Sequence, residues 1–205
     1  KTDWKGDVII MLIPPPSTLL LNRYFTREFF MQIHRMLDHS GVFMCSTGAG
    51  DNYLNDEALK LNSSVFNTLG SVFKNVAIVP GNKIYILASD KEISLEFCAL
   101  TERKNIKNLY VNSDYLSDEI TERRSDEITR HLDPGEKENT TAYPLAYNYF
   151  QLYHLSRSSN EKIPAIIMLA LLFAVPGIAA TRKNMLMYFS ASALAGYEII
   201  ALLTL

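Results

Sequence analysis

Apolar and polar positions alternate along the first 70 residues in a way that predicts strands and helices in turn. Residues 7–13 form a short β-branched run that ends in prolines, which is typical of a strand buried on both faces. Residues 42–47 form a second apolar run. After Thr26 and after Asn55, apolar residues recur at helical spacing, and we expect Gly41 to end the first of these two helices. The order strand, helix, strand, helix indicates an α/β fold.

Two further β-rich runs follow, at residues 75–79 and 83–88. Because only a short turn separates them, we expect antiparallel neighbours at the tail of a doubly wound sheet. Two more helices are predicted at residues 92–104 and 116–132. The second of these carries much charge and only a sparse apolar stripe, made of Leu116, Ile120, Ile128 and Leu132.

A polar, turn-rich loop at residues 134–141 leads into an aromatic segment at residues 143–153. Its rings could line a polyamine pocket through cation–π contacts, or they could belong to the core or to an aromatic belt near a membrane surface. The sequence leaves both interpretations open. The aromatic residues in question are Tyr143, Tyr147, Tyr149, Phe150 and Tyr153.

Charged side chains become rare toward the end of the chain. They occupy 3 of the last 43 positions but 39 of the first 162, so two different surroundings are expected. Residues 163–180 are uncharged and reach roughly 27 Å as a helix, close to the hydrocarbon thickness of a bilayer. Residues 185–205 form a second apolar stretch that only Glu198 interrupts. We predict a transmembrane helical hairpin, with a buried helix of a soluble protein as the alternative.

Composition excludes several classes of protein. A net charge of −2 excludes a strongly basic nucleic-acid binder, and 48% apolar residues exclude a disordered chain. The four histidines are scattered and the two cysteines lack metal-ligand spacing, so we expect no metal site and buried free thiols. The chain begins at a lysine without a signal-like segment and stops inside an apolar run, so we expect a fragment.

A glycine pair at residues 48–50 imitates the start of a dinucleotide-binding loop. Tyr53 occupies the position at which that fingerprint requires its third glycine, and this favours an ordinary loop between strand and helix.

Several short motifs, together with the order of the elements, resemble the C-terminal half of the spermidine synthase family, the polyamine aminopropyltransferases. The likeness is closest to bacterial versions fused to membrane helices, and it covers roughly residues 5–155. The motifs are DVII at 7–10, PST at 16–18, NRYFT at 22–26 with Glu28, Phe29 and Phe30, residues 41–43, VPG at 79–81, and NTTAYPLAY at 139–147.

The resemblance implies a Rossmann-like, methyltransferase-type sheet in which decarboxylated S-adenosylmethionine donates an aminopropyl group to a diamine. It places an acceptor pocket around Ser17, Thr18, Asn22 and Tyr24. The donor site belongs largely to the N-terminal half of this fold, so we expect no cofactor site in this fragment.

The organisation that follows is a spermidine synthase-like α/β domain at residues 1–133, a polar loop and aromatic linker at 134–162, and a truncated transmembrane hairpin at 163–205. The expected location is an integral membrane protein with its soluble domain in the cytoplasm. The expected partners are the membrane and a polyamine or other small molecule, without nucleic acid.

The chain departs from the family at the catalytic loop. There the family keeps a D-x-x-D-P sequence, whose first carboxylate deprotonates the attacking amine and whose second binds the substrate ammonium. Alignment through Pro16 puts Leu12 and Pro15 at these two positions. Asp7 lies five residues before Leu12, roughly 16 Å away along a strand, which is too far to replace it.

The catalytic residues are therefore left unassigned, and three hypotheses remain. The intact protein is an aminopropyltransferase-like enzyme, a module that binds a polyamine or nucleoside without turnover, or a structural domain that docks the membrane hairpin. The missing carboxylates favour the second and third hypotheses, whereas the family resemblance favours the first.

Overall fold

The computed structural model of the 205-residue chain describes residues 5–48, 55–158 and 194. The chain divides into two units, Lys1–His154 and Leu155–Leu205. Both predicted transmembrane segments, residues 163–180 and 185–205, lie outside the described residues except for Leu194. None of the helices in the described part is both long enough and apolar enough to cross a membrane.

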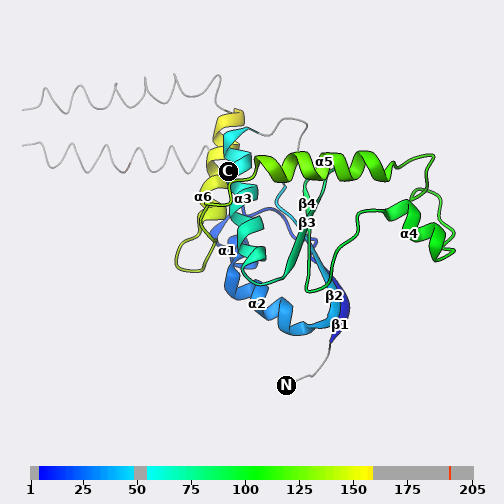
Figure 1. The fold of residues 1–205 in the computed structure, drawn as a ribbon. Coiled ribbons are helices and arrows are strands. Elements are labelled where there is room, and N and C mark those ends of the chain that lie inside the picture. Colours follow the sequence, from blue (N-terminus) through cyan, green and yellow to red (C-terminus); the bar gives the residue numbers. More distant parts are fainter. Residues whose placement is uncertain (1–4, 49–54, 159–193, 195–205) are drawn as a thin grey trace, which may run out of the picture. The chain divides into compact units, whose positions relative to one another are not determined.

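The first unit is built on a mixed four-stranded sheet (Figure 1). Its strands are β1 (Gly6–Ile10), β2 (Leu37–Ser46), β3 (Asn75–Val79) and β4 (Tyr85–Ser89), in the spatial order β1-β2-β4-β3. β1 and β2 are parallel, whereas β4 is antiparallel to both β2 and β3. The α/β class and the antiparallel pair formed by β3 and β4 are confirmed.

Helices connect the strands, and side-chain caps start the two helices that the sequence predicted there. Thr26 Oγ1 accepts a hydrogen bond from Phe29 N (3.4 Å), and Asn55 Oδ1 accepts one from Ala58 N (2.9 Å). The helices are α1 (Leu19–Asn22), the 3-10 helix η1 (Arg23–Phe25), α2 (Arg27–Met36), α3 (Asp56–Gly70), α4 (Phe97–Arg103), α5 (Asp118–His131) and α6 (Leu145–Ser158).

The prediction that Gly41 ends a helix is wrong. Helix α2 ends at Met36, and β2 already begins at Leu37 and continues through Gly41. Close approach of two strands explains this glycine, because a Cβ at Gly41 would lie 3.0 Å from Gly6 O and 2.8 Å from Leu37 Cδ2. The register between β1 and β2 is also irregular at this point, between Gly6 and Val8.

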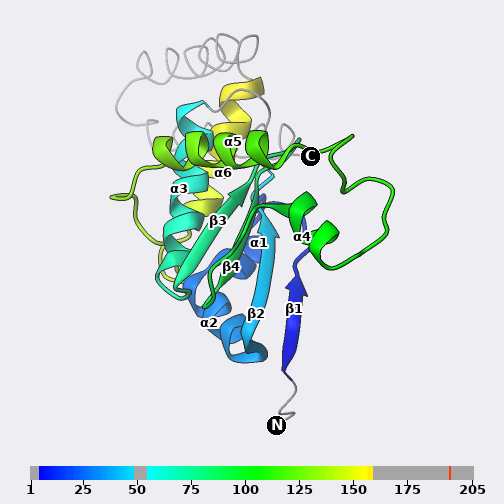
Figure 2. The ribbon, with the colours of Figure 1, turned by 45° about the vertical axis from the view of Figure 1, so that its right-hand side comes forward.

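The prediction that the first strand is buried on both faces is also wrong for this structure. β1 is an edge strand whose partner in the described sheet is β2 alone (Figure 2). Val8 and Ile10 share one face and are 59% and 54% exposed, whereas Ile9 on the other face packs against the core. Alternation of side chains along a strand explains why an apolar run splits in this way.

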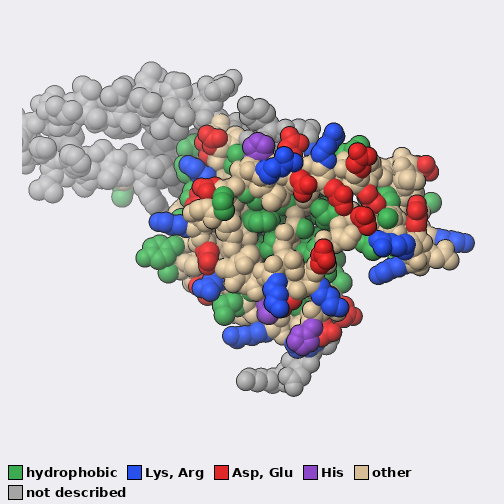
Figure 3. Space-filling view, in the orientation of Figure 1, with side chains coloured by type: hydrophobic (Ala, Val, Ile, Leu, Met, Phe, Trp, Pro, Cys, Tyr) green, Lys and Arg blue, Asp and Glu red, His purple; other side chains and the backbone are tan. Residues whose placement is uncertain are grey.

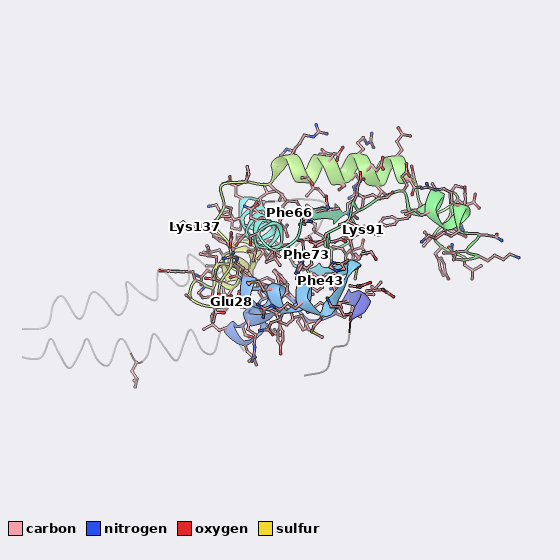
Figure 4. All side chains as sticks on the ribbon, turned by 60° about the horizontal axis from the view of Figure 1, so that its bottom comes forward. Glu28, Phe43, Phe66, Phe73, Lys91 and Lys137 are labelled. Atoms are coloured by element: carbon pink, nitrogen blue, oxygen red, sulfur yellow. The ribbon has the colours of Figure 1, made fainter. Side chains whose placement is uncertain are left out.

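The core lies between the sheet and helices α2 and α3. Inward-facing residues of β2 and β4, such as Phe43 and Ile86, are fully buried, and Phe43 stacks on Phe73 with ring centroids 6.3 Å apart (Figure 4). Phe30 from α2 joins them, 5.7 Å from the Phe43 ring. Burial of these aromatic side chains supplies much of the hydrophobic stabilisation of the unit.

Helix α5 buries part of the predicted stripe, because Leu132 lies in the core and Ile128 packs against it. Ile120 is exposed, whereas Thr121 and Ser125 are buried together with Leu132. Positions 121, 125, 128 and 132 follow one helical face, and small polar residues occupy two of them. The apolar stripe was therefore predicted correctly at Ile128 and Leu132, and it was wrong at Ile120.

Helix α4 is shorter than predicted, and another helix caps its N-terminus. The two carboxylate oxygens of Asp118, in the first turn of α5, accept hydrogen bonds from Cys98 N and Ala99 N, both at 3.0 Å. Burial alone would raise the pKa of the Asp118 carboxyl, but these backbone N–H groups hold the pKa below its ordinary value. Asp118 thus ties α4 to α5.

Replacing Asp118 with alanine is expected to speed hydrogen exchange at the Cys98 and Ala99 amides and to cost about 1 kcal/mol of local stability, as loss of a cap does. Because the folded-state pKa is lowered, the contact is fully formed above the ordinary Asp pKa of about 3.9 and is lost as the pH falls further. Asp114→Ala, at an exposed neighbouring carboxylate, is the control. Equal exchange rates in both variants would exclude the capping role.

Candidate functional site

The candidate site lies where the two parallel strands end. In α/β sheets, ligands bind at the carboxyl ends of parallel strands, and here the segments that follow β1 and β2 meet. The ladder extends one step past β1, because Met11 N donates to Met44 O at 2.8 Å. The chain then leaves the sheet through prolines 14–16 and enters α1 and η1, which carry the predicted acceptor residues.

Contact between Pro15 and Gly48 joins the two segments. Gly48 has a φ of +77°, and a Cβ at this position would lie 2.8 Å from Pro15 Cβ and 2.9 Å from Pro15 Cγ. Both the left-handed backbone conformation and the close approach therefore require glycine. The glycine at this position serves strand-to-loop geometry, in agreement with the interpretation as an ordinary loop.

Apolar side chains occupy the two positions that the motif alignment assigned to carboxylates. Leu12 is 82% exposed, and Pro15 is packed against Gly48. Neither side chain can accept a proton or pair with an ammonium group. Asp7 lies within β1 and precedes Leu12 in the chain, whereas the predicted acceptor residues follow Leu12.

Thr18 and Ser17 shape the turn that enters α1. Thr18 Oγ1 accepts a hydrogen bond from Leu21 N at 3.2 Å, so the hydroxyl caps the helix. The backbone of Ser17 is held on both sides, with its N–H donating to Pro15 O (2.6 Å) and its carbonyl accepting from Gln151 Nε2 (2.8 Å). The half-buried Ser17 side chain and the exposed Thr18 side chain remain near the surface.

Tyr24 lies on η1 and contacts two neighbours. Its ring meets Phe29 edge-on at 5.3 Å, and the guanidinium of Arg23 lies 5.5 Å from its centroid. Tyr24 is half-buried, so part of the ring is accessible for stacking or cation–π contact with a ligand.

Asn22 is turned into the protein and is buried. Its Oδ1 accepts hydrogen bonds from Asn139 Nδ2 (3.2 Å) and from Tyr147 N (3.0 Å). The four predicted residues thus follow one another along the turn at Ser17 and Thr18, α1 and η1, while Asn22 Oδ1 is engaged inside the fold. A role for these residues in binding substrate stays a prediction.

Asn139 forms the centre of this buried network, a role the sequence did not reveal. Its Nδ2 also donates to Phe25 O (2.9 Å), and its Oδ1 accepts from Ala146 N (3.2 Å). Its backbone N–H donates to Thr68 Oγ1 (2.8 Å), and its carbonyl accepts from Arg27 N (2.9 Å). The fully buried side-chain amide thereby connects α1, η1 and α6, and the backbone of the same residue connects to α2 and α3.

A polar face of α3 holds the segment that leads to Asn139. Asn67 Nδ2 donates to the carbonyls of Asp133 (3.0 Å) and Glu136 (2.8 Å). Ser64 Oγ donates to Lys137 O (2.8 Å), and Ser63 Oγ accepts from Asp133 N (2.9 Å). These contacts satisfy the backbone of a loop, residues 133–139, that forms neither helix nor strand. The polar loop was predicted correctly, but its attachment to α3 was not.

A buried pair also lies at the carboxyl end of β2. Thr47 Oγ1 donates to Asn62 Oδ1 at 2.5 Å, and both side chains are fully buried. Asn62 Nδ2 has no hydrogen-bond partner in the described part of the chain. A buried donor without a partner is the kind of group that an ordered water or a ligand atom satisfies.

The aromatic segment forms α6 and mostly packs inward. Ala146 and Phe150 are buried in the core, and the Tyr149 hydroxyl donates to Glu136 Oε1 at 2.8 Å. Burial and this carboxylate raise the pKa of Tyr149 to about 12. Tyr143 is exposed. For Phe150 the core interpretation is therefore confirmed, and Tyr149 is half-buried against the core.

The two cysteines are free and buried, as predicted, and burial raises the pKa of the Cys45 thiol to about 12. Across residues 5–48 and 55–158, no group of three or more His, Cys, Asp or Glu side chains is arranged to hold a metal ion.

No family model and no curated protein sequence matches the chain. Among solved structures, the chain is similar to the crystal structure of a probable spermidine synthase from Corynebacterium glutamicum ATCC 13032. The TM-score is 0.39 and the sequence identity is 20%, over 68% of this chain and 48% of that one. The chain therefore spans about half the length of that protein.

Proposed function

We propose that this chain contains the C-terminal half of a spermidine synthase-like domain in a membrane-anchored protein, and that it does not catalyse aminopropyl transfer at residues 12–24. The motifs quoted above and the order of strands and helices support the relationship. The uncharged stretch at residues 163–180 and the apolar stretch at 185–205, which only Glu198 interrupts, support the membrane anchor, and the proposed position of the soluble domain is cytoplasmic.

The absence of a base in the catalytic loop carries this proposal. An ammonium group attacks nothing until it loses a proton, and a positioned general base typically contributes about 10²- to 10⁴-fold to such a step. Leu12 and Pro15 have no group that could take this proton. We therefore expect aminopropyl transfer to be lower than in a family enzyme by about the same factor.

The other residues of the motifs that resemble the family have structural roles. Thr18 caps α1, Thr26 caps α2, and Asn22 and Asn139 hydrogen-bond to each other in the buried network. Substitution of any of these would disturb the fold whether or not the protein catalyses a reaction. The resemblance is thus compatible with a domain that has kept its scaffold and lost its base.

Ligand binding without turnover is the second candidate function. The unpaired Asn62 Nδ2 near the carboxyl end of β2 favours it, as does the accessible part of the Tyr24 ring. A polyamine or a nucleoside would offer the cation or the ring system that such groups bind. A purely structural module would bind neither.

A transfer assay tests the proposal. The full chain is incubated with putrescine and labelled decarboxylated S-adenosylmethionine, and labelled product is compared with a reaction without protein. We expect no product above this background. Robust turnover that persists in variants of Leu12, Ser17 and Tyr24 would remove both the proposal and the site assignment.

The Leu12→Asp variant is the complementary test. Because Leu12 is 82% exposed, the change is expected to alter stability by less than about 0.5 kcal/mol. A carboxylate here would tighten putrescine binding by about 0.5 to 1 kcal/mol, as an exposed ion pair does, measurable by titration calorimetry. Leu20→Asp, at an exposed leucine of α1, is the matched control and should leave affinity unchanged. Equal affinities in both variants would contradict an acceptor pocket near residue 12.

A further inference from the structure

We infer that a second site binds a phosphomonoester or a free phosphate dianion, and that protonation of His34 controls this binding. The second site lies at the end of the sheet opposite the candidate site. This site is a hollow of about 250 Å³ at the end of α2 and the start of β2. The inference is independent of the proposed function, because it uses no residue of the catalytic loop. The hollow is lined by Lys5, His34, Arg35, Leu37, Asp38, His39, Gly41, Phe73 and Asp90.

A hydrogen-bonded pair fixes the position of His34. Its Nε2 lies 2.9 Å from Asp90 Oδ2, and its ring meets Phe73 edge-on at 5.1 Å. Phe73 is itself stacked on Phe43 in the core, so the imidazole rests on a rigid support (Figure 4). Asp90 is held in turn by Lys74 N, which donates to Oδ1 at 3.4 Å.

The pair also determines which nitrogen of His34 carries a proton. Burial alone would raise the pKa of the Asp90 carboxyl, but the hydrogen bond and charge of His34, with Lys74, hold the pKa below its ordinary value. An ionised carboxylate only accepts, so His34 Nε2 must be the donor. Nδ1 is left for a second partner, and it becomes a donor to an anion only when the ring is protonated.

Two permanent cations line the same hollow. Lys5 Nζ donates to Leu37 O at 3.3 Å, which holds the ammonium over the start of β2. Arg35 is adjacent to His34 and also lines a smaller hollow of about 180 Å³. Within the described residues, neither Lys5 nor Arg35 forms an ion pair. Their donors are therefore available to a ligand.

The charge of the hollow depends on its histidines. Lys5 and Arg35 balance Asp38 and Asp90, so the lining is neutral overall when His34 and His39 are neutral. Protonation of both histidines leaves two positive charges, which match a dianion. Figure 3 shows histidine and basic side chains close together on the lower part of the face in view. Affinity for a dianion should rise as the pH falls.

Other uses of a His–Asp pair fit this hollow less well. Its described lining contains no serine, threonine or cysteine that the imidazole could activate, which argues against nucleophilic catalysis. Metal binding is disfavoured because no suitable group of three ligands occurs in the described part of the chain. The planar guanidinium and the ammonium suit a phosphate group, which accepts several charge-assisted hydrogen bonds at once.

Titration calorimetry of the full chain with sulfate tests this inference. Sulfate stays a dianion across the range used, so any pH dependence comes from the protein. Affinity is measured at constant ionic strength at about pH 5.5 and about pH 7.5, on either side of the reference imidazole pKa of roughly 6.5. We expect binding about tenfold tighter at the lower pH.

Variants assign the effect to residues. His34→Gln keeps a hydrogen-bonding side chain but cannot be protonated, so the pH dependence should fall to about threefold or less. Arg35→Gln should weaken binding about fivefold or more at both pH values. His131→Gln and Arg130→Gln, on the exposed end of α5, are the matched controls and should behave as the unaltered chain.

Inorganic phosphate and water-soluble dihexanoyl phosphatidic acid then identify the source of the phosphate group. Similar affinities for the two would assign a free phosphate or small phosphoester, and much tighter binding of the second would assign a lipid headgroup. No measurable sulfate binding at either pH would overturn the inference. The inference would also be overturned if the His34→Gln variant were less stable but bound sulfate with unchanged pH dependence. The pair of His34 and Asp90 would then be purely structural.

Discussion

Replacing Asn139 with alanine is expected to lower the free energy of unfolding by about 3 to 5 kcal/mol. The change removes the two hydrogen bonds that Asn139 Nδ2 donates, to Asn22 Oδ1 and Phe25 O, and the one that its Oδ1 accepts from Ala146 N. The Phe25 carbonyl and the Ala146 N–H would be left without these partners in buried surroundings, and each unsatisfied group costs about 1 to 3 kcal/mol. Urea unfolding of the full chain, followed by circular dichroism, measures the loss.

Asn148→Ala is the matched control for this prediction. Asn148 lies in the same segment, on the exposed face of α6, so its replacement should change stability by no more than about 0.5 kcal/mol. A similar, small effect in both variants would mean that the side-chain amide of Asn139 does not hold α1, η1 and α6 together. Hydrogen exchange at Ala146 gives an independent reading, since this amide donates to Asn139 Oδ1 and should lose protection only in the Asn139 variant.

Replacing Gly48 with alanine is expected to destabilise the protein by about 2 to 3 kcal/mol. Alanine at a φ of +77° is strained, and its methyl group would meet Pro15 Cβ at 2.8 Å. The segments after β1 and β2 would have to separate, so the variant should also alter any ligand binding near Ser17 and Tyr24. Thermal unfolding of the full chain measures the first effect.

Gly70→Ala provides a control with the opposite sign. Gly70 is the last residue of α3, and an added Cβ would meet nothing within 4 Å. Alanine should therefore stabilise the chain by about 0.4 to 1 kcal/mol, chiefly by restricting the unfolded state. Equal destabilisation by both glycine substitutions would show that the contact between Pro15 and Gly48 is unimportant.

Local sequence patterns predicted the structure correctly where it depended on residues close together in the chain. The caps at Thr26 and Asn55 started helices where the sequence predicted them, because a side-chain acceptor and the backbone donors it satisfies lie within one turn. The antiparallel pair β3–β4 also followed directly, because a short turn places its two flanking strands side by side.

The errors arose where a second element decides the role of a residue. Gly41 is typical of a helix end by type, but the approach of Gly6 places it inside a strand. Ile120 is apolar yet exposed, because α5 presents Thr121 and Ser125 to the interior. Val8 and Ile10 are exposed because β1 has one sheet neighbour in the described part. The type of a residue does not reveal which other helix or strand will pack against it.

The same distinction between side-chain type and tertiary contact applies to the candidate site. The sequence alone determined that Leu12 and Pro15 carry no proton-accepting group, because the chemistry of a side chain is set by its type. Only the tertiary structure decided that Asn22 faces Asn139 from 117 residues away, and that His34 pairs with Asp90 from 56 residues away. Hydrogen bonds between distant segments depend on how helices pack against the sheet, and no local pattern of residues encodes that arrangement.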